Sequence, residues 1–210
     1  MRPIAIIDYG MGNLLSVQKA LDRLGYPVEV TDDPGEIIAA PGVILPGVGA
    51  FADAMANLQQ KGLVAAIREV AERGVPLLGI CLGLQLLFST SEEGGQVAGL
   101  DLLPGEVKRL PAGIKVPHMG WNQVHFPRPG ALFRGIPEGT DFYFVHSYYI
   151  VPREEEVVTG TTEYGLEFAV SIQRGNLFGV QFHPEKSSRR GLEVLKNFGE
   201  LVRHAGNAGH

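Results

Sequence analysis

The chain has 210 residues, of which 45% are hydrophobic and 20% are charged, a composition typical of one globular domain (residues 1–210) with a sizeable core. Its formal net charge of -5, with no run of Lys and Arg, argues against a nucleic-acid surface. A single Cys excludes an intramolecular disulfide and leaves too few thiols for a zinc ribbon, so we expect neither a metal nor a cofactor.

We expect a cytoplasmic protein that makes no contact with a membrane. The N-terminal sequence Met-Arg-Pro leads directly into an apolar run and lacks the pattern of a signal peptide. No apolar stretch approaches the ~18 residues that a membrane-spanning helix requires.

Up to Gly74, short apolar runs alternate with helical patterns. We expect strands at residues 4–7, 28–31 and 43–45, and helices at residues 13–24, 50–60 and 63–73. Asn13 is a candidate N-cap of the first helix, and Asp32-Asp-Pro-Gly35 is expected to form a turn. This alternation, with short loops, predicts an α/β fold with an open, mostly parallel twisted sheet and helices on both faces.

Gly10 and Gly12 follow the first strand, where a dinucleotide-binding loop would begin. That fingerprint requires a third glycine, and Leu15 stands at its position, so this interpretation is disfavoured. A tight strand-to-helix turn explains the two glycines. A ligand-binding role for the loop remains open, because ligands of open α/β sheets collect at the carboxyl ends of strands.

The segment from Val75 to Phe88 contains Gly79-Ile-Cys81-Leu-Gly83, the Cys form of a nucleophile elbow. In an elbow a buried strand, here expected from Val75 to Ile80, turns sharply into a helix, here expected from Leu82 to Phe88. The glycines leave room for the turn, and the helix N-terminus favours the thiolate of Cys81. The alternative interpretation is that Cys81 is only a small buried side chain.

From about Gly94 onward, frequent turn signals separate shorter runs, which predicts a partly antiparallel extension of the sheet. We expect strands around residues 106–110, 142–151, 168–172 and 177–182, a last helix at 189–204 and a frayed tail at 205–210. The strand at 142–151 could carry His146 and Ser147 toward a cleft. Residues 117–123 have the composition of a surface loop, in which Trp121 is either a partly buried anchor or an interface residue.

A Cys nucleophile needs a base and an orienting partner for that base, and Phe182-His183-Pro-Glu185 supplies both. Residues i and i+2 of an extended backbone point to the same side, so the Glu185 carboxylate is expected beside the His183 ring. We therefore predict a Cys81–His183–Glu185 triad, although an exposed His and Glu at a strand end is the alternative. Five histidines are weaker candidates, being terminal, in turn-rich segments or far from an acid: His118, His125, His146, His204 and His210.

The segments Gly79-Ile-Cys81-Leu-Gly83-Leu-Gln85 and Phe182-His183-Pro-Glu185 resemble the motifs of class I (triad) glutamine amidotransferases, which have a flavodoxin-like fold. The resemblance covers essentially the whole chain. Four more segments resemble one subfamily, the glutaminase subunits of imidazole glycerol phosphate synthase in histidine biosynthesis: Asp8-Tyr-Gly-Met-Gly-Asn13, Leu45-Pro-Gly-Val-Gly49, Pro117-His-Met-Gly-Trp-Asn122 and Tyr143-Phe-Val-His-Ser-Tyr148. The chain is therefore expected to hydrolyse L-glutamine to glutamate and ammonia.

The resemblance implies a role for each residue of the site. The Cys81 thiolate would attack the glutamine carboxamide and form a thioester, His183 would protonate the leaving ammonia and then activate water, and Glu185 would orient His183. The oxyanion hole is implied at three backbone N–H groups: Val48, Gly49 and Leu82. The glutamine-binding set is implied at Gln85, Ser147 and Tyr148.

The resemblance also implies a heterodimer in which ammonia passes to a separate (β/α)8-barrel cyclase. That subunit would make imidazole glycerol phosphate and an aminoimidazole carboxamide ribonucleotide. No phosphate-binding loop is evident in this chain, as expected if the nucleotide binds only to the partner. The loop at residues 46–49 is a candidate switch, because rotation of one peptide there would add or remove an oxyanion donor. The docking and gating face is expected to include Asn13, Met119, Trp121, Asn122, Gln123, Tyr143 and Lys186.

Three rival interpretations are weaker. A glutaminase of another ammonia-channelling complex, such as pyridoxal phosphate synthase, is disfavoured by the segments 8–13 and 117–122. A non-catalytic or protease-like relative is disfavoured by Gln85 and the His183-Pro-Glu185 run. A different α/β hydrolase would place its acid before the His in chain order.

Overall fold

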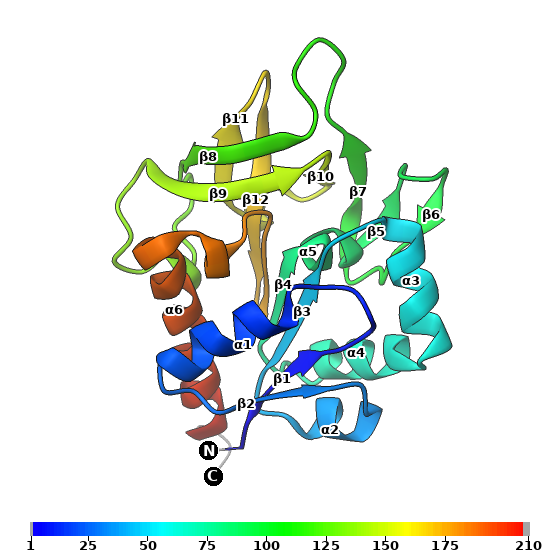
Figure 1. Cartoon of the computed structure of the whole chain (residues 1–210), viewed down its shortest axis with the longest axis vertical. Helices are drawn as coiled ribbons and strands as arrows, with labels where there is room; N and C mark the ends of the chain where they lie inside the picture. The colour runs from blue at the N-terminus through cyan, green and yellow to red at the C-terminus, as the bar shows by residue number, and fades with distance from the viewer. Residues whose placement is uncertain (1, 208–210) are drawn as a thin grey trace.

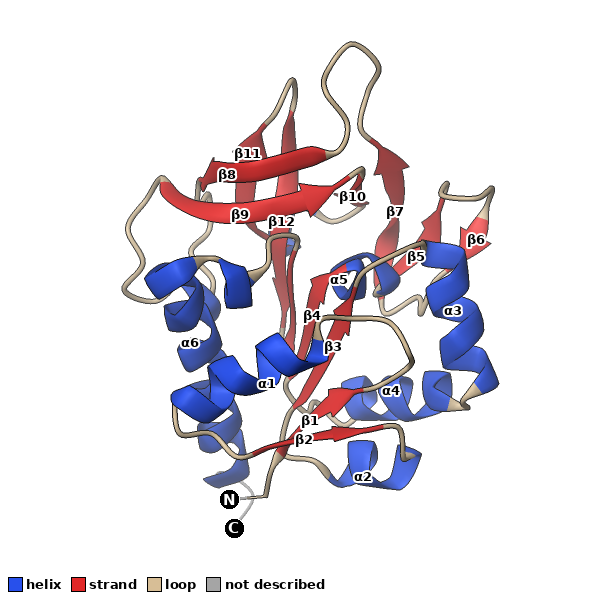
Figure 2. Cartoon of the chain, in the orientation of Figure 1, coloured by secondary structure: helices blue, strands red, loops and turns tan. Residues whose placement is uncertain are grey.

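The computed structural model describes residues 2–207 (Figure 1, Figure 2). Its α-helices are α1 (Leu14–Arg23), α2 (Pro34–Ala39), α3 (Phe51–Gln60), α4 (Leu63–Glu72), α5 (Leu82–Leu86) and α6 (Ser188–Asn207). Its strands are β1 (Ile4–Ile7), β2 (Val28–Thr31), β3 (Val43–Gly47), β4 (Leu77–Cys81), β5 (Phe88–Ser91), β6 (Val97–Ala98), β7 (Leu103–Arg109), β8 (His118–Val124), β9 (Thr140–His146), β10 (Tyr148–Pro152), β11 (Val158–Glu163), β12 (Glu167–Arg174) and β13 (Leu177–Val180). Short 3-10 helices are η1 (Ala131–Phe133), η2 (Glu155–Val157) and η3 (Pro184–Lys186). None of the helices within this described part combines the length and hydropathy of a membrane span.

Eleven strands form one mixed sheet in the order β2-β1-β3-β4-β13-β12-β10-β7-β5-β6, with β11 paired to β12. Neighbours from β2 to β13 are all parallel, whereas β13–β12, β12–β10 and β10–β7 are antiparallel. Strands β8 and β9 form a second, two-stranded sheet, which lies across the end of the large sheet in Figure 2. The predicted fold class, a parallel α/β sheet with an antiparallel extension, is confirmed.

The parallel strands are continuous apolar runs because both of their faces are buried. In β1, Ala5 and Ile7 pack in one core with α2, α3 and α4, while Ile4 and Ile6 pack in another core with α1 and α6. Figure 1 shows these two groups of helices on opposite sides of the sheet. Since β4 lies between β3 and β13, the end of β4 at Cys81 is held from both faces and both edges.

The turn expected at Asp32-Asp-Pro-Gly35 is instead the start of helix α2. The Asp33 side chain accepts hydrogen bonds from the backbone N–H groups of Gly35 and Glu36, at 2.7 and 3.0 Å. Pro34 occupies the first helical position, where its missing N–H costs nothing. Asp and Pro signal both turns and helix starts, which is why the prediction was wrong.

Several other boundaries also differ from the predictions. The helix expected to reach Phe88 ends at Leu86, and Phe88 begins β5. The expected surface loop at 117–123 is mostly strand β8, because pairing with β9 along its whole length overrides a turn-like composition. The run at 142–151 is broken at Ser147, β4 begins at Leu77, and α6 continues to Asn207 through part of the expected frayed tail. Residues 208–210, including His210, lie outside the described residues.

Candidate active site

Cys81 lies at a sharp strand-to-helix turn, as the elbow pattern predicts. It is the last residue of β4 and has φ 54° and ψ -111°, while α5 begins at Leu82. A positive φ at a residue with a Cβ atom typically costs ~1–3 kcal/mol. A Cβ atom at Gly79 would lie 2.7 Å from the carbonyl oxygen of Gly83, and one at Gly83 would overlap the carbonyl oxygen of Leu45. Both glycines are therefore needed for the strand and helix to approach so closely.

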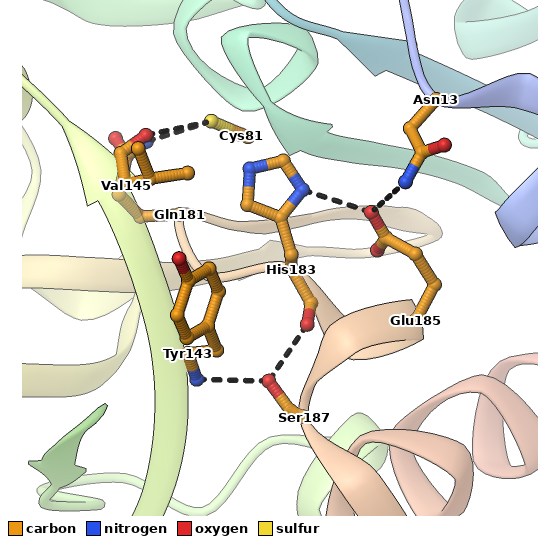
Figure 3. A network of polar contacts seen from close by, with 8 residues as sticks. All are labelled: Asn13, Cys81, Tyr143, Val145, Gln181, His183, Glu185 and Ser187. Atoms are coloured by element: carbon orange, nitrogen blue, oxygen red, sulfur yellow. Dashed lines mark hydrogen bonds and ion pairs between the residues drawn. The ribbon is translucent and has the colours of Figure 1, made fainter. Parts of the chain in front are cut away.

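His183 and Glu185 lie side by side just after β13. Their side chains are 2% and 1% exposed, and 2.9 Å separates Nδ1 of His183 from Oε1 of Glu185. Figure 3 shows the other ring nitrogen on the side of Cys81. The predicted reason for this proximity was wrong, because the backbone at Pro184–Lys186 forms the 3-10 helix η3 and is not extended.

Backbone and side-chain hydrogen bonds fix the position of this pair. The N–H of His183 donates to the carbonyl of Tyr143 at 2.9 Å, and the hydroxyl of Ser187 donates to the carbonyl of His183 at 2.7 Å. Asn13 Nδ2 donates to Oε1 of Glu185 at 3.4 Å, so its side chain does not cap α1 as predicted. The pair is thus held by strand β9, by Ser187 between η3 and α6, and by the loop that precedes α1.

The proton state of His183 follows from its neighbours. Burial of the ring lowers its pKa, but the hydrogen bond to Glu185 and the charges of Cys81 and Glu185 outweigh that effect. They raise the pKa of His183 from 6.5 to about 10, so the ring carries a proton at neutral pH. Among the described residues, Nε2 of His183 is buried without a hydrogen-bond partner, which leaves this N–H available to a bound molecule.

A cavity of about 430 Å³ opens in front of Cys81. It brings together all six of the predicted oxyanion and glutamine-binding residues: Val48, Gly49, Leu82, Gln85, Ser147 and Tyr148. Gln85 Nε2 donates to the carbonyl of Tyr148 at 3.0 Å and to Oε1 of Gln181 at 3.1 Å. Both hydrogens of that amide are used within the protein, so its oxygen Oε1 is the atom left to accept a hydrogen bond from a ligand.

The loop after β3 also lines the cavity, through Val48 and Gly49. Gly49 has φ 103°, in the region that favours glycine, and a Cβ atom there would lie 2.6 Å from Cε of Met11. The side chain of Val48 is 41% exposed. The Tyr9 hydroxyl donates to the carbonyl of Pro46, near the end of β3, at 2.9 Å. The loop therefore follows a strand end that is fixed, and it is exposed at Val48.

Of the residues predicted to form a docking face, some are exposed and others point into the protein. Met119 and Trp121 are 61% and 55% exposed on one face of β8, and the Trp121 ring packs edge to face on Tyr143 of β9. Gln123 shares that exposed face, since side chains alternate along a strand, and Lys186 is exposed in η3. Asn122 lies on the inner face, where its side chain binds His118 and the carbonyl of Glu163.

Two features of the site were not predicted from the sequence. Gln181 is fully buried and donates through Nε2 to the sulfur of Cys81 at 3.6 Å. His118 and His146, which the sequence analysis ranked only as weaker candidates for the base, are hydrogen-bonded to each other, and His146 lines the cavity, as expected for the strand at 142–151. The available signal for Gln181 was a polar residue within the otherwise apolar run expected as a strand at residues 177–182, two positions before His183. Within residues 2–207, no three His, Cys, Asp or Glu side chains gather as metal ligands would.

Comparisons with known proteins agree with this geometry. Residues 5–201 match the family model described as glutamine amidotransferase class-I. The chain is 99% identical to imidazole glycerol phosphate synthase subunit HisH of Moorella thermoacetica over 210 residues, covering 100% of both chains. It is 55% identical to the HisH subunit of Desulfitobacterium hafniense strain Y51, over 95% of this chain and 94% of that relative.

Two solved structures share the fold at low sequence identity. PurLQS from Thermotoga maritima superposes with a TM-score of 0.72 and 20% identity, over 97% of this chain and 99% of that chain. The glutaminase domain of CTPS from Trypanosoma brucei, with bound acivicin, superposes with a TM-score of 0.68 and 13% identity, over 99% and 94%. The sequence matches and the shared fold lead to one assignment: the chain belongs to the class I glutamine amidotransferase family, in the branch of the HisH subunits of imidazole glycerol phosphate synthase.

Proposed function

We propose that this chain is a glutaminase that acts through Cys81, His183 and Glu185 and delivers ammonia to a (β/α)8-barrel cyclase subunit of imidazole glycerol phosphate synthase. The observation that carries the proposal is the buried His183–Glu185 pair, at 2.9 Å, beside a Cys at a strained elbow. A buried ion pair of this kind is expensive to maintain, so its position next to a nucleophile supports a catalytic role.

In the proposed first half-reaction, the Cys81 sulfur attacks the side-chain carbonyl carbon of L-glutamine. The carbonyl oxygen becomes an oxyanion, and backbone N–H groups at Leu82 and Val48 would donate to it, each such donor typically contributing ~3 kcal/mol. The C–N bond then breaks, and the protonated ring of His183 gives its proton to the leaving nitrogen. A glutamyl thioester on Cys81 and free ammonia result.

In the second half-reaction, water replaces ammonia. The neutral His183 ring takes a proton from the water as the water oxygen attacks the thioester carbonyl. The carbon–sulfur bond breaks, glutamate leaves, and the Cys81 sulfur and the protonated His183 return to their starting state. Glu185 stabilises the imidazolium in both steps without itself accepting the proton.

The proposed position of the substrate follows from which polar atoms of the cavity wall are free to hydrogen-bond a ligand. Gln85 offers only its oxygen Oε1, which would accept from the α-ammonium group of glutamine. Ser147 lies between β9 and β10, where the chain passes from one ladder to the other, and it lines the cavity. Glutamine would thus lie between Gln85 and Ser147, with its carboxamide at Cys81.

The cyclase would dock on the exposed face of β8, where Met119 and Trp121 lie together. Large apolar side chains, Trp above all, are enriched at the energetic centres of protein interfaces. The printed name of the relatives, a subunit of a synthase, supports a multi-subunit enzyme. The expected cytoplasmic location suits such a biosynthetic complex.

The test is release of glutamate from L-glutamine by the purified chain, alone and with the cyclase subunit and its nucleotide ligand. We expect the chain alone to release almost no glutamate and the cyclase subunit with its bound ligand to stimulate release strongly. Cys81→Ala should abolish glutamate release in both conditions. High activity of the chain alone would retain the triad but point to a different glutaminase. Activity that survives Cys81→Ala, or no activity in either condition, would overturn the proposal.

A further inference from the structure

Two buried histidines outside the triad face each other across the β8–β9 ladder. His118 and His146 are 3% and 6% exposed and are direct partners in the antiparallel register. Nδ1 of His118 lies 2.9 Å from Nε2 of His146. The His118 ring is stacked between Phe144 and Tyr164, with ring centroids 4.9 and 4.0 Å away. The proposed reaction uses neither ring.

The hydrogen bonds of this pair have one consistent direction. The carbonyl of Tyr148 can only accept, so the His146 nitrogen 2.8 Å from it, Nδ1, carries the hydrogen. Nε2 of a neutral His146 is then an acceptor, and the His118 nitrogen that faces it, Nδ1, must donate. Nε2 of His118 in turn accepts from Asn122 Nδ2 at 3.3 Å, whose second hydrogen goes to the carbonyl of Glu163 at 2.9 Å.

A further proton on either histidine ring would break this set of hydrogen bonds. If His146 were protonated, its Nε2–H would require Nδ1 of His118 to accept, and Nε2–H of His118 would then face the N–H of Asn122. Burial lowers the pKa of His118 to about 4. Burial is also the largest cause of the lowering of the His146 pKa to about 3, and it outweighs the hydrogen bond to the Tyr148 carbonyl, which raises that pKa. Both rings are therefore neutral, with hydrogen on Nδ1.

The hydrogen bonds from Asn122 through His118 and His146, here called the relay, end at the Tyr148 carbonyl oxygen. That oxygen also supports the proposed glutamine pocket. The carbonyl of Tyr148 accepts from His146 on one side and from Gln85 on the other. Gln85 is bonded to Gln181, which donates to the sulfur of Cys81. An unbroken set of hydrogen bonds thus joins Asn122 on β8 to the nucleophile. Four of its members line the cavity: His146, Tyr148, Gln85 and Cys81.

We propose that His118 and His146 are positioning residues, whose one-directional relay fixes the Tyr148 carbonyl and, through it, the Gln85 side chain that receives glutamine. The inference rests on the proposed function, since it assumes that glutamine is the molecule bound in the cavity. It predicts that damage to the relay weakens glutamine binding more than it slows the chemistry at Cys81.

Two substitutions at His146 separate positioning from filling of space. The amide nitrogen of Asn can replace Nδ1 and keep the bond to the Tyr148 carbonyl, whereas Gln reaches the place of Nε2 and loses that bond. We expect His146→Gln to raise KM for glutamine about five- to tenfold, with kcat changed less, and His146→Asn to stay within about twofold of the unaltered protein. If the ring only fills space, Gln, which is closer in volume to His, will be the milder substitution, and that result would overturn the proposal.

The assay is glutamate release in the presence of the cyclase subunit and its ligand. His125→Asn is the matched control, because His125 is exposed, lies just beyond β8 and pairs with Glu138 away from the cavity. This control should leave KM unchanged. Thermal unfolding of each variant identifies any that fails to fold.

A second measurement needs no variant. The ¹⁵N shifts of the histidine rings in the intact protein at pH 7 should show His118 and His146 neutral with hydrogen on Nδ1. An Nε2–H form or a protonated ring at either position would overturn the relay and leave the Cys81-dependent reaction standing. Conversely, glutamate release that survives Cys81→Ala would overturn the proposed function and leave the ring states unchanged.

Discussion

The molecule contains two buried histidine sites whose rings have opposite proton states. His183 has a pKa raised to about 10, whereas His146 has one lowered to about 3. Both rings are buried, so burial is not what separates them. His183 faces a carboxylate and a thiol, while His146 faces a second imidazole and a backbone carbonyl. Burial removes the charge from a histidine unless an anionic partner is buried with it.

The two sites also differ in what their protons can do. The proton on Nε2 of His183 has no partner among the described residues, so it can move to a substrate. The proton on Nδ1 of His146 is held by the Tyr148 carbonyl, at 2.8 Å. A site with a free proton suits acid–base chemistry, and a site with a fixed proton suits positioning.

The largest effect is expected from removal of the thiol that faces His183. Cys81→Ala should lower the rate of glutamate release by about 10⁴-fold or more, because no covalent intermediate can form. It should also lower the pKa of His183, since the sulfur is one of the groups that raise it. Glutamate assays and an NMR titration of His183 measure the two effects. An unchanged His183 pKa in this variant would contradict the role given to the sulfur.

Removal of the carboxylate tests the other partner of His183. Glu185→Gln preserves the shape of the side chain but not its charge, and it should lower kcat by about 10²- to 10⁴-fold. The pKa of His183 should fall toward 6.5 while the pKa of His146 stays low. A matched Glu138→Gln variant, at the exposed pair with His125, should leave kcat unchanged. Equal activity of the two variants would show that charge at Glu185 is not needed.

The contrast between the two sites depends on the elbow that holds Cys81 beside His183. Gly83→Ala should destabilise the fold by ~2 kcal/mol or more, because the new methyl group would overlap the backbone carbonyl of Leu45. Gly206→Ala in α6 is the control, since no atom lies within 4 Å of its added methyl group. Urea unfolding measures both changes. Equal stability of the two variants would contradict the close approach at the elbow.

The smallest effect is on the pH dependence of stability, and its sign differs between the sites. The raised pKa of His183 gives a contribution that is complete below pH 6.5 and is lost as pH rises toward about 10. The lowered pKa values of His118 and His146 give a contribution that is complete above pH 6.5 and is lost as pH falls toward about 3.

Variants distinguish the alkaline loss of stability, assigned to His183, from the acidic loss, assigned to His118 and His146. In urea unfolding followed from pH 4 to 10, Glu185→Gln should flatten the loss of stability above pH 6.5 and leave the acidic side unchanged. His118→Gln should flatten the loss of stability below pH 6.5 and leave the alkaline side unchanged, although this variant is less stable at every pH. A Glu185→Gln variant that retains the alkaline loss would contradict the assignment of that loss to His183.

The elbow at Cys81 and the proximity of His183 to Glu185 were predictable because the motif behind each is local. Two glycines mark the elbow around Cys81, and His183 and Glu185 lie two positions apart, so short stretches of sequence sufficed. The parallel sheet was predictable for a similar reason, since its buried strands are continuous apolar runs. The backbone between His183 and Glu185 was predicted wrongly because an X-Pro-X run is compatible with both an extended chain and a 3-10 helix.

The second histidine site could not be found in this way. His118 and His146 are brought together only by the β8–β9 ladder, and the β8 sequence, with Pro117 and Gly120, has the composition of a loop. The ring directions depend further on the Tyr148 carbonyl and on Asn122, which are set by tertiary structure. Contacts of this kind have no local signal in the sequence.

The most direct test of the contrast is one NMR titration of the ¹⁵N-histidine-labelled protein, with every described ring followed in the same sample. The account predicts that His183 loses its proton near pH 10 and that His118 and His146 gain theirs only below about pH 4. Titration of His183 near 6.5 would contradict its coupling to Cys81 and Glu185. Titration of His118 or His146 near 6.5 would contradict the neutral relay.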